Sequence, residues 1–180
     1  PSLYEIVHSL ARSTEPELIS QLAASLQRFP TDQALPLLAQ VLLKEQFTSD
    51  PYIPSQLWWA LETHVGKAPD AVLSWLAETP LWQTPIFETK LASLLARRLA
   101  SDPSEANLTR LAQLLETAPN TITSALIQGI DAGLQGITLT TIPSALDRSL
   151  VRVSSQNPQS LDTLLFGLRL QSAGARETAL

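Results

Sequence analysis

The sequence contains no cysteine and no methionine, and only 16% of its 180 residues are charged. Without cysteine, these residues cannot form a disulfide, a thiolate zinc site, a cysteine nucleophile or a covalent c-type haem attachment. No apolar run approaches the roughly 18 residues that a membrane-spanning helix needs. No charged-then-apolar leader is present either, so we expect no targeting signal and no membrane insertion within this chain.

Positive charge is also scarce. Twelve Lys and Arg residues stand against 17 Asp and Glu residues, and the formal net charge is −5, with a pI of about 5.0. Proteins that bind nucleic acid usually present a basic face to the phosphates, so we expect no nucleic-acid partner. The hydrophobic fraction of 44% is that of a chain that folds.

Helical periodicity is present almost throughout. Apolar residues recur at the i, i+3, i+4, i+7 spacing of amphipathic helices, as in Leu18, Ile19, Leu22, Ala23 and Leu26. We expect about ten helices, beginning near residues 2, 15, 32, 54, 69, 85, 103, 121, 143 and 158. Alternate starts lie roughly 30 to 40 residues apart, the period of helix-pair repeats. This predicts an all-α, HEAT- or armadillo-like α-solenoid of antiparallel helix pairs, and a compact helical bundle is the alternative.

Two segments qualify this pattern. The β-prone stretch at 136–143, "GITLTTIP", breaks the helical rhythm, and we interpret it as an extended connection. The residues at 172–180 look like the opening of a further helix, and a solenoid that stopped there would expose an apolar end. We therefore expect residues 1–180 to form a single helical-repeat domain within a larger multidomain protein.

The most distinctive stretch is "DPYIPSQLWWALETHVG", from Asp50 to Gly66. In a helical projection Trp58 and His64 share the core arc with neighbouring leucines and Val65, whereas Trp59 points away from that arc. Gly66 is placed to end this helix. The core arc predicts a buried Trp58 and a His64 at the edge of the core.

The other side of the same helix is the candidate binding surface. It carries Ser55, Trp59 and Glu62, and Tyr52 approaches from the preceding loop. An indole, a phenol and a carboxylate together can bind a sugar ring, a cation or a partner peptide. The alternative is structural, because helices of a solenoid pack on both sides and need bulky residues there. Glu62 would then pair with a neighbouring segment.

Other constellations are weaker. His8 and His64 are the only histidines and lack the spacing of a metal site, so we expect no metal. No GxSxG elbow or phosphate-binding glycine loop occurs, and we expect no catalytic residues. Lys90, Arg97 and Arg98 form the best basic patch, because Lys90 and Arg97 are seven residues apart. This patch is either an anion or partner site or a solvated face.

Several strings carry a family resemblance: "DPYIPSQLWWALE" (50–62), "LLARRLA" (94–100), "LAQLLETAP" (111–119) and "LIQGIDAGLQG" (126–136). With these residues the chain resembles the HEAT-like region of large multidomain haem-binding proteins of planctomycete and verrucomicrobial bacteria. That family carries the description of membrane-bound dehydrogenase and has a cytochrome-c-type domain. The resemblance implies an extracytoplasmic or periplasmic location and a c-type haem in a separate domain, because this chain has no cysteine to attach one.

These observations predict a non-catalytic interaction or scaffold domain. Its partners would be other domains of the same polypeptide or a separate protein, and it would hold no cofactor of its own. Two alternatives use Trp59 and Glu62. One is an enzyme of the HEAT-like DNA glycosylase type, against which the sparse positive charge argues. The other is a module that binds a sugar or another small molecule.

Overall fold

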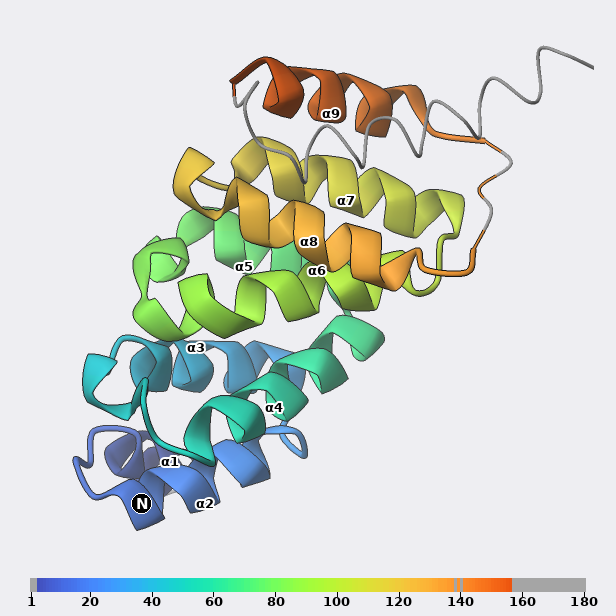
Figure 1. The fold of residues 1–180 in the computed structure, drawn as a ribbon. Coiled ribbons are helices and arrows are strands. Elements are labelled where there is room, and N and C mark those ends of the chain that lie inside the picture. Colours follow the sequence, from blue (N-terminus) through green and yellow to red (C-terminus); the bar gives the residue numbers. More distant parts are fainter. Residues whose placement is uncertain (1–2, 138, 140, 157–180) are drawn as a thin grey trace, which may run out of the picture. The chain divides into compact units, whose positions relative to one another are not determined.

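The computed structural model describes residues 3–137, 139 and 141–156, and the regular structure in this part of the chain is entirely helical. The fold class predicted from the sequence, all-α, is therefore confirmed. The longer helices begin within a few residues of the expected positions, except that a π-helical turn precedes α6 (Figure 1). They are α1 (Leu3–Leu10), α2 (Pro16–Leu26), α3 (Thr31–Leu42), α4 (Ile53–Lys67), α5 (Pro69–Glu78), α6 (Ala92–Ala100), α7 (Glu105–Thr117), α8 (Thr123–Gly133) and α9 (Ser144–Gln156). The helix expected from residue 158 and the opening at 172–180 lie outside the described residues.

Proline explains where several helices begin. A proline occupies one of the first two helical positions of α2, α4 and α5. The first N–H groups of a helix have no intrahelical acceptor, so a residue without an N–H costs nothing there. Short turns fill the connections: the 3₁₀ turns η1 (Glu45–Phe47), η2 (Pro80–Gln83) and η4 (Asn120–Ile122), and the π-helical turn η3 (Phe87–Leu91).

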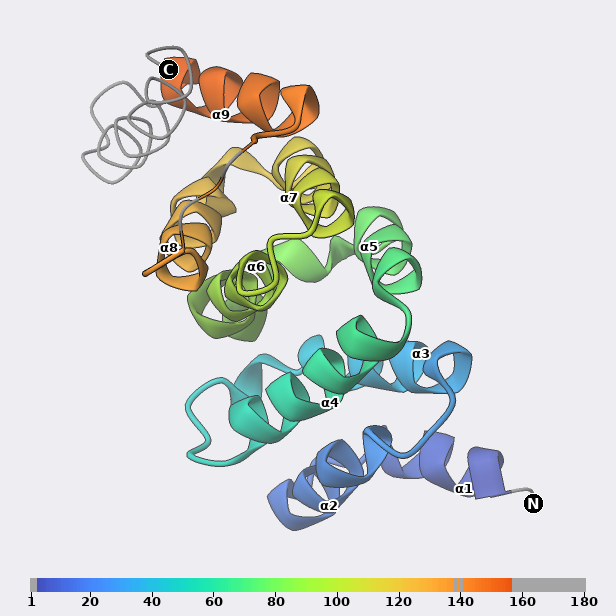
Figure 2. The ribbon, with the colours of Figure 1, turned by 90° about the vertical axis from the view of Figure 1, so that its right-hand side faces the viewer.

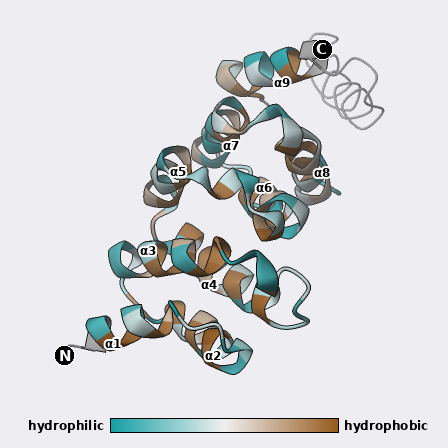
Figure 3. Cartoon of the chain, turned by 90° about the vertical axis from the view of Figure 1, so that its left-hand side faces the viewer, coloured by the Kyte–Doolittle hydropathy of each residue, from teal (hydrophilic) through white to brown (hydrophobic). Residues whose placement is uncertain are grey.

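The chain divides into two compact units, Pro1–Leu91 and Ala92–Leu180. We expected a single domain, and that remains a prediction. In the first unit α4 contacts α2, α3 and α5. Hydrophobic residues gather where α2, α3 and α4 face one another (Figure 3), and they include Ile19, Leu38 and Leu57, which are fully buried.

In the first unit α2 and α4 run parallel. Ser20 on α2 donates a hydrogen bond to Gln56 on α4, and Lys67 at the end of α4 reaches the Gln27 carbonyl just after α2. Because residue numbers rise together along both helices, α2 and α4 point the same way, and Figure 2 shows them side by side. The sequence separations of these two bonds are 36 and 40 residues.

The second unit repeats this arrangement with other residues. Ser149 on α9 donates to the Ala112 carbonyl of α7, and Arg152 donates to the carbonyl of Leu115, with a separation of 37 residues in both cases. α8 lies against α6 in the same sense, because Gly129 meets Ser93 and Ala96 while Gly133 meets Arg97 and Ala100. The contact between α6 and α8 is the most extensive in the described part of this unit.

Between α8 and α9 the chain is not helical. Gly136, with φ of 77°, is the only residue with positive φ among those that the structure describes. A side chain is disfavoured in that conformation, so glycine suits the turn that leaves α8. The described residues of 136–143 contain no strand. For that described part, the interpretation of the segment as a connection agrees with the structure.

Candidate functional site

Helix α4 begins at a turn held by the side chain of Asp50. Its Oδ1 accepts hydrogen bonds from the backbone N–H groups of Tyr52 and Ile53, both at 2.8 Å. These are among the N–H groups that a helix start leaves without intrahelical acceptors. Pro54 follows at one of the first helical positions. The Asp50 side chain thus fixes the residue at which α4 begins and holds the backbone of Tyr52 in place.

The inner side of α4 is anchored by His64, which is fully buried. Its Nε2 lies 3.0 Å from the carbonyl oxygen of Leu26, the last residue of α2, and its Nδ1 lies 3.1 Å from Oγ1 of Thr31, the first residue of α3. A carbonyl can only accept, so Nε2 carries the hydrogen and donates it. In the neutral ring Nδ1 then accepts from the Thr31 hydroxyl. His64 therefore joins three helices, and both of its ring nitrogens are used.

Burial lowers the pKa of His64 below its ordinary value of 6.5. Loss of hydration disfavours the charged ring and is the largest cause, and the positive charge of Lys67 acts in the same direction. The hydrogen bond to Leu26 opposes both. We expected His64 at the edge of the core, but it lies inside. In the part of the chain that the structure describes, no three His, Cys, Asp or Glu side chains are grouped as a metal site would require.

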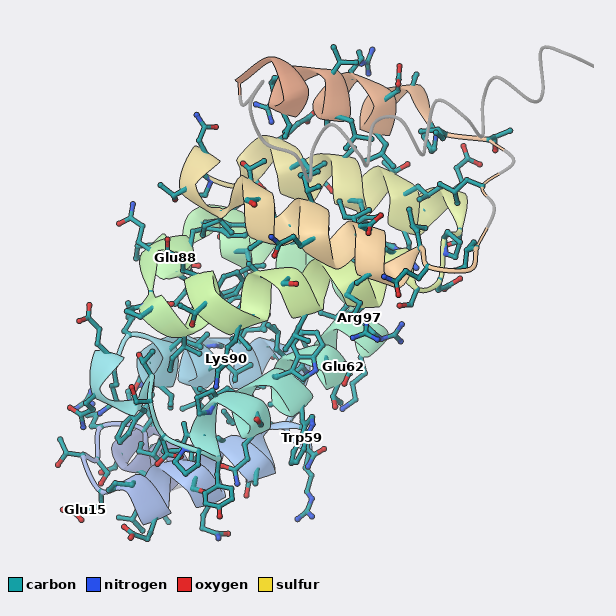
Figure 4. The ribbon with its side chains drawn as sticks, viewed as in Figure 1. Glu15, Trp59, Glu62, Glu88, Lys90 and Arg97 are labelled. Carbon is teal, nitrogen blue, oxygen red and sulfur yellow. The ribbon has the colours of Figure 1, made fainter. Side chains whose placement is uncertain are left out.

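The predicted binding residues lie on the outer side of α4, except Tyr52, which immediately precedes the helix. Tyr52 is 69% exposed and Trp59 is 56% exposed. Ser55 is exposed, and Glu62 is half-buried. The four positions are spaced by three or four residues and so follow one side of the helix. Trp59 and Glu62 project from α4 in Figure 4. We call Tyr52, Ser55 and Trp59 the outer strip of α4.

Glu62 differs from the rest of this set. Its side chain is half-buried and already has an interaction partner within the protein. A carboxylate in that position is less available to a ligand than one that faces solvent. That Glu62 pairs with a neighbouring segment stays a prediction. The two exposed rings are the stronger part of the predicted site.

Two expectations about this helix are corrected. Trp58 is half-buried and not a core residue, whereas Leu57 and Leu61 beside it are buried. By helical geometry Trp58 lies about 100° from the centre of the buried side, which is its edge. Gly66 does not end the helix either, because α4 continues to Lys67. Nothing lies within 4 Å of the place where a Cβ of Gly66 would be.

The predicted basic patch is not assembled on one regular helix. Lys90 is exposed and lies in the π-helical turn η3 of the first unit. Arg97 is exposed and Arg98 is half-buried on α6 of the second unit (Figure 4). The argument that Lys90 and Arg97 share a face assumed α-helical spacing, and a π-helical turn changes that spacing. A joint patch of these three residues stays a prediction.

Sequence reasoning missed two features that hold the helices together. One is the pair Gly129 and Gly133, at which a Cβ would lie 2.1 Å from the Ser93 carbonyl oxygen and 2.7 Å from the Arg97 carbonyl oxygen respectively. The signal was available as "GIDAG", two glycines four residues apart on one helix face. The other is the pairing of His64 with Leu26 and Thr31, which no local spacing reveals.

Comparisons of the chain with protein-family models, with curated proteins and with solved structures give no match. Within the described residues, no helix has both the length and the apolar character needed to cross a bilayer.

Proposed function

We propose that this chain is a non-catalytic interaction domain that joins or positions parts of a larger protein. The observation that carries the proposal is the outer strip of α4, where Tyr52 and Trp59 are more than half exposed on a well-anchored helix. Large aromatic side chains supply much of the binding energy at protein interfaces, and rigid ones lose little entropy when they bind. The packing of α4 provides that rigidity.

The architecture supports a scaffold of the HEAT type within each unit. The pairs α2–α4, α6–α8 and α7–α9 are each parallel. In the first unit, hydrogen bonds between helical segments span 31 to 40 residues, from Lys44 to the Ser13 carbonyl and from Lys67 to the Gln27 carbonyl. This is the period at which helix pairs repeat in α-solenoids. In such arrays each repeat buries its apolar side against the next and leaves an extended surface for partners.

The resemblance noted above supplies the wider context of this proposal. The larger protein would be a haem-binding, redox-related protein of the extracytoplasmic space, and its c-type haem would belong to a separate domain. This chain would contribute contact surface and spacing, with no cofactor of its own.

The proposal is tested by hydroxyl-radical footprinting, which reports the solvent exposure of individual side chains. The oxidation rates of Tyr52 and Trp59 are compared between the 180-residue chain and a longer polypeptide that contains it. The comparison uses a protein concentration at which both are monomeric. We expect both rates to fall several-fold in the longer polypeptide. Val151, which is 62% exposed on α9, serves as the control. Equal rates for Trp59 in the two proteins would refute an intramolecular contact role for the outer strip.

A second candidate is a module that binds a sugar or another small molecule. The exposure of two aromatic rings on one helix side favours it, because sugar rings stack on such faces. Titration of the chain with neutral oligosaccharides, followed by tryptophan fluorescence, tests this candidate. Trp59→Phe removes the reporting indole but keeps an aromatic ring. A saturable change in the wild-type chain that is lost in this variant would place the ligand at Trp59.

A further inference from the structure

The relative heights of residues on α2 and α4 follow from two hydrogen bonds. Ser20 pairs with Gln56 near the start of the two helices, and Lys67 pairs with the Gln27 carbonyl near their end. Interpolation between these two contacts places Trp59 level with Leu22. Because the helices are parallel, a position on α4 can be matched with one on α2, and distances along α2 follow from its rise of about 1.5 Å per residue.

The solvent-facing sides of α2 and α4 form one continuous surface. On α2, Ser20 lies on the side that contacts α4. Glu17 lies about 60° from Ser20 around the helix axis, in the direction away from the buried residues. On α4, Gln56 lies on the side that contacts α2. Trp59 lies about 60° from Gln56 around the axis of α4, also in the direction away from the buried residues. Glu17 and Trp59 are both exposed. Figure 4 shows Trp59 projecting from α4 toward solvent. We call this surface the α2–α4 face.

Charges of opposite sign lie at the two ends of this face. Glu17 lies five residues before Leu22, which is about 7.5 Å along the axis. Arg28 lies six residues after Leu22, about 9 Å in the other direction, in the turn that extends α2 through the bond from its N–H to the Ser25 carbonyl. Both side chains are exposed. Lys67 adds a second positive charge at the Arg28 end, where it donates to Gln27.

We propose that the α2–α4 face binds a second copy of this chain about a two-fold axis at the level of Trp59. This inference rests on the proposed interaction role of the outer strip, and it assigns a second copy as the partner of that strip in the 180-residue chain. A two-fold interface must match itself. Rotation about this axis places Glu17 of each copy opposite Arg28 of the other, because the two charges are at nearly equal distances from Trp59. The exposed indoles meet near the axis, where interface aromatics contribute most.

Other occupants fit this face less well. A purely acidic segment would meet Arg28 but would be repelled by Glu17, and a basic segment would have the opposite conflict. A second copy satisfies both ends at once, and its aromatic strip covers the aromatic strip of the first. Because the charges are exposed, the attraction is screened by salt. The self-association is therefore salt-sensitive.

Sedimentation of the 180-residue chain over a range of concentrations tests the proposal. We expect the average mass to rise toward that of a dimer with increasing concentration and to fall back at high salt. Trp59→Ala should raise the dissociation constant at least tenfold, whereas Val151→Ala, an exposed apolar position on α9, should leave it unchanged. A chain that stays monomeric at every concentration would overturn the proposal, as would equal effects of the two substitutions.

Charge reversal gives the more specific test. Glu17→Lys and Arg28→Glu should each weaken self-association, because each places like charges opposite one another twice in the dimer. An equimolar mixture of the two variants should regain wild-type affinity, since Lys at 17 of one variant then faces Glu at 28 of the other. Recovery in the mixture also demonstrates that both variants are folded. No recovery, with circular dichroism showing both variants folded, would refute the two-fold arrangement.

Failure of this inference can be told apart from failure of the proposed function. A chain that never dimerises excludes the second copy as the partner. It leaves the footprinting experiment unchanged, since that experiment compares monomeric proteins. A different result is that Trp59 is oxidised equally fast in the longer polypeptide and in the 180-residue chain while the chain forms a charge-dependent dimer. That result would support the second copy as partner and refute the intramolecular role.

Discussion

The helix pairs α2–α4 and α6–α8 are both parallel pairs within one unit, but they are joined by different means. In each pair the two helices are separated along the chain by one other α-helix, α3 in the first pair and α7 in the second. α4 reaches α2 with side chains, using His64 and Lys67 to donate to the Leu26 and Gln27 carbonyls. At Gly129 and Gly133, which have no side chain, the backbone of α8 lies directly against α6. Polar side chains can bridge helices at a distance, whereas glycine lets two backbones touch.

The difference has a thermodynamic consequence. The α2–α4 pair depends on hydrogen bonds to carbonyl groups near the end of α2, which is where a helix leaves acceptors unsatisfied. It also depends on the protonation state of His64, because burial disfavours the charged ring. The α6–α8 pair depends on the absence of side-chain volume. The atoms that meet the two glycines belong to the backbone of Ser93, Arg97 and Ala100 and to the side chains of Ala96 and Ala100, and none of them titrates. The two pairs should respond to different perturbations.

The largest expected effect is that of His64→Ala. The substitution leaves a cavity between three helices and removes the hydrogen-bond partner of Thr31 Oγ1, although Leu26 still accepts from the N–H of Phe29. We expect a loss of about 2–4 kcal/mol in the opening free energy of the first unit. Hydrogen exchange of peptides from 16–67 measures this loss. Peptides from 92–133 in the same sample are the control, and equal loss of protection in both regions would contradict a role confined to α2–α4.

Gly129→Ala should act on the other pair. The new methyl group would lie 2.1 Å from the Ser93 carbonyl oxygen, so the backbones must separate. Helix propensity favours alanine by up to about 1 kcal/mol, and overpacking costs about 1–3 kcal/mol or more. We expect a net loss, read as faster exchange in 92–133 with 16–67 unchanged. Wild-type or slower exchange in 92–133 would show that α6 and α8 are not in backbone contact.

Lowering the pH should weaken the first pair alone. The folded-state pKa of His64 is below the ordinary value of 6.5, so the unfolded chain binds the proton more readily. Stability from the neutral ring is complete above about pH 6.5 and is lost as the pH falls toward the lowered pKa. Hydrogen exchange at pH 7.5 and 5.0, corrected for intrinsic rates, should show this loss in 16–67. His64→Gln, which cannot titrate, should remove the pH dependence specific to that region.

The smallest expected effect is a gain from Gly66→Ala. This glycine is exposed near the end of α4, has no neighbour within 4 Å of a Cβ, and does not have positive φ. We expect a stabilisation of about 0.5 kcal/mol from helix propensity alone. It is the matched control for Gly129→Ala, since the same chemical change is made in a helix without a close neighbour. A destabilising result, measured by exchange in 16–67, would reveal a contact at Gly66.

Much of the helical framework could be predicted from the sequence. Apolar periodicity and prolines at helix starts depend on neighbours a few residues away, and they place α2, α4 and α5 within one residue of their observed beginnings. Helical geometry also separated Trp59 from the apolar arc, but it left open whether a neighbouring helix covers that side, and Trp59 is 56% exposed. Trp58 was misplaced, since periodicity alone cannot say how far a neighbouring helix covers the edge of that arc.

The sequence by itself therefore determined which segments are helical and which sides of them are apolar, because both depend on local spacing and backbone chemistry. Only the tertiary structure decided which helices meet and how closely. His64 forms hydrogen bonds with Leu26 and Thr31, which are 38 and 33 residues away in the sequence. Gly129 of α8 lies against Ser93 of α6. Such partners are set by the packing of whole helices, where volume, buried hydrogen bonds and backbone approach must be satisfied together.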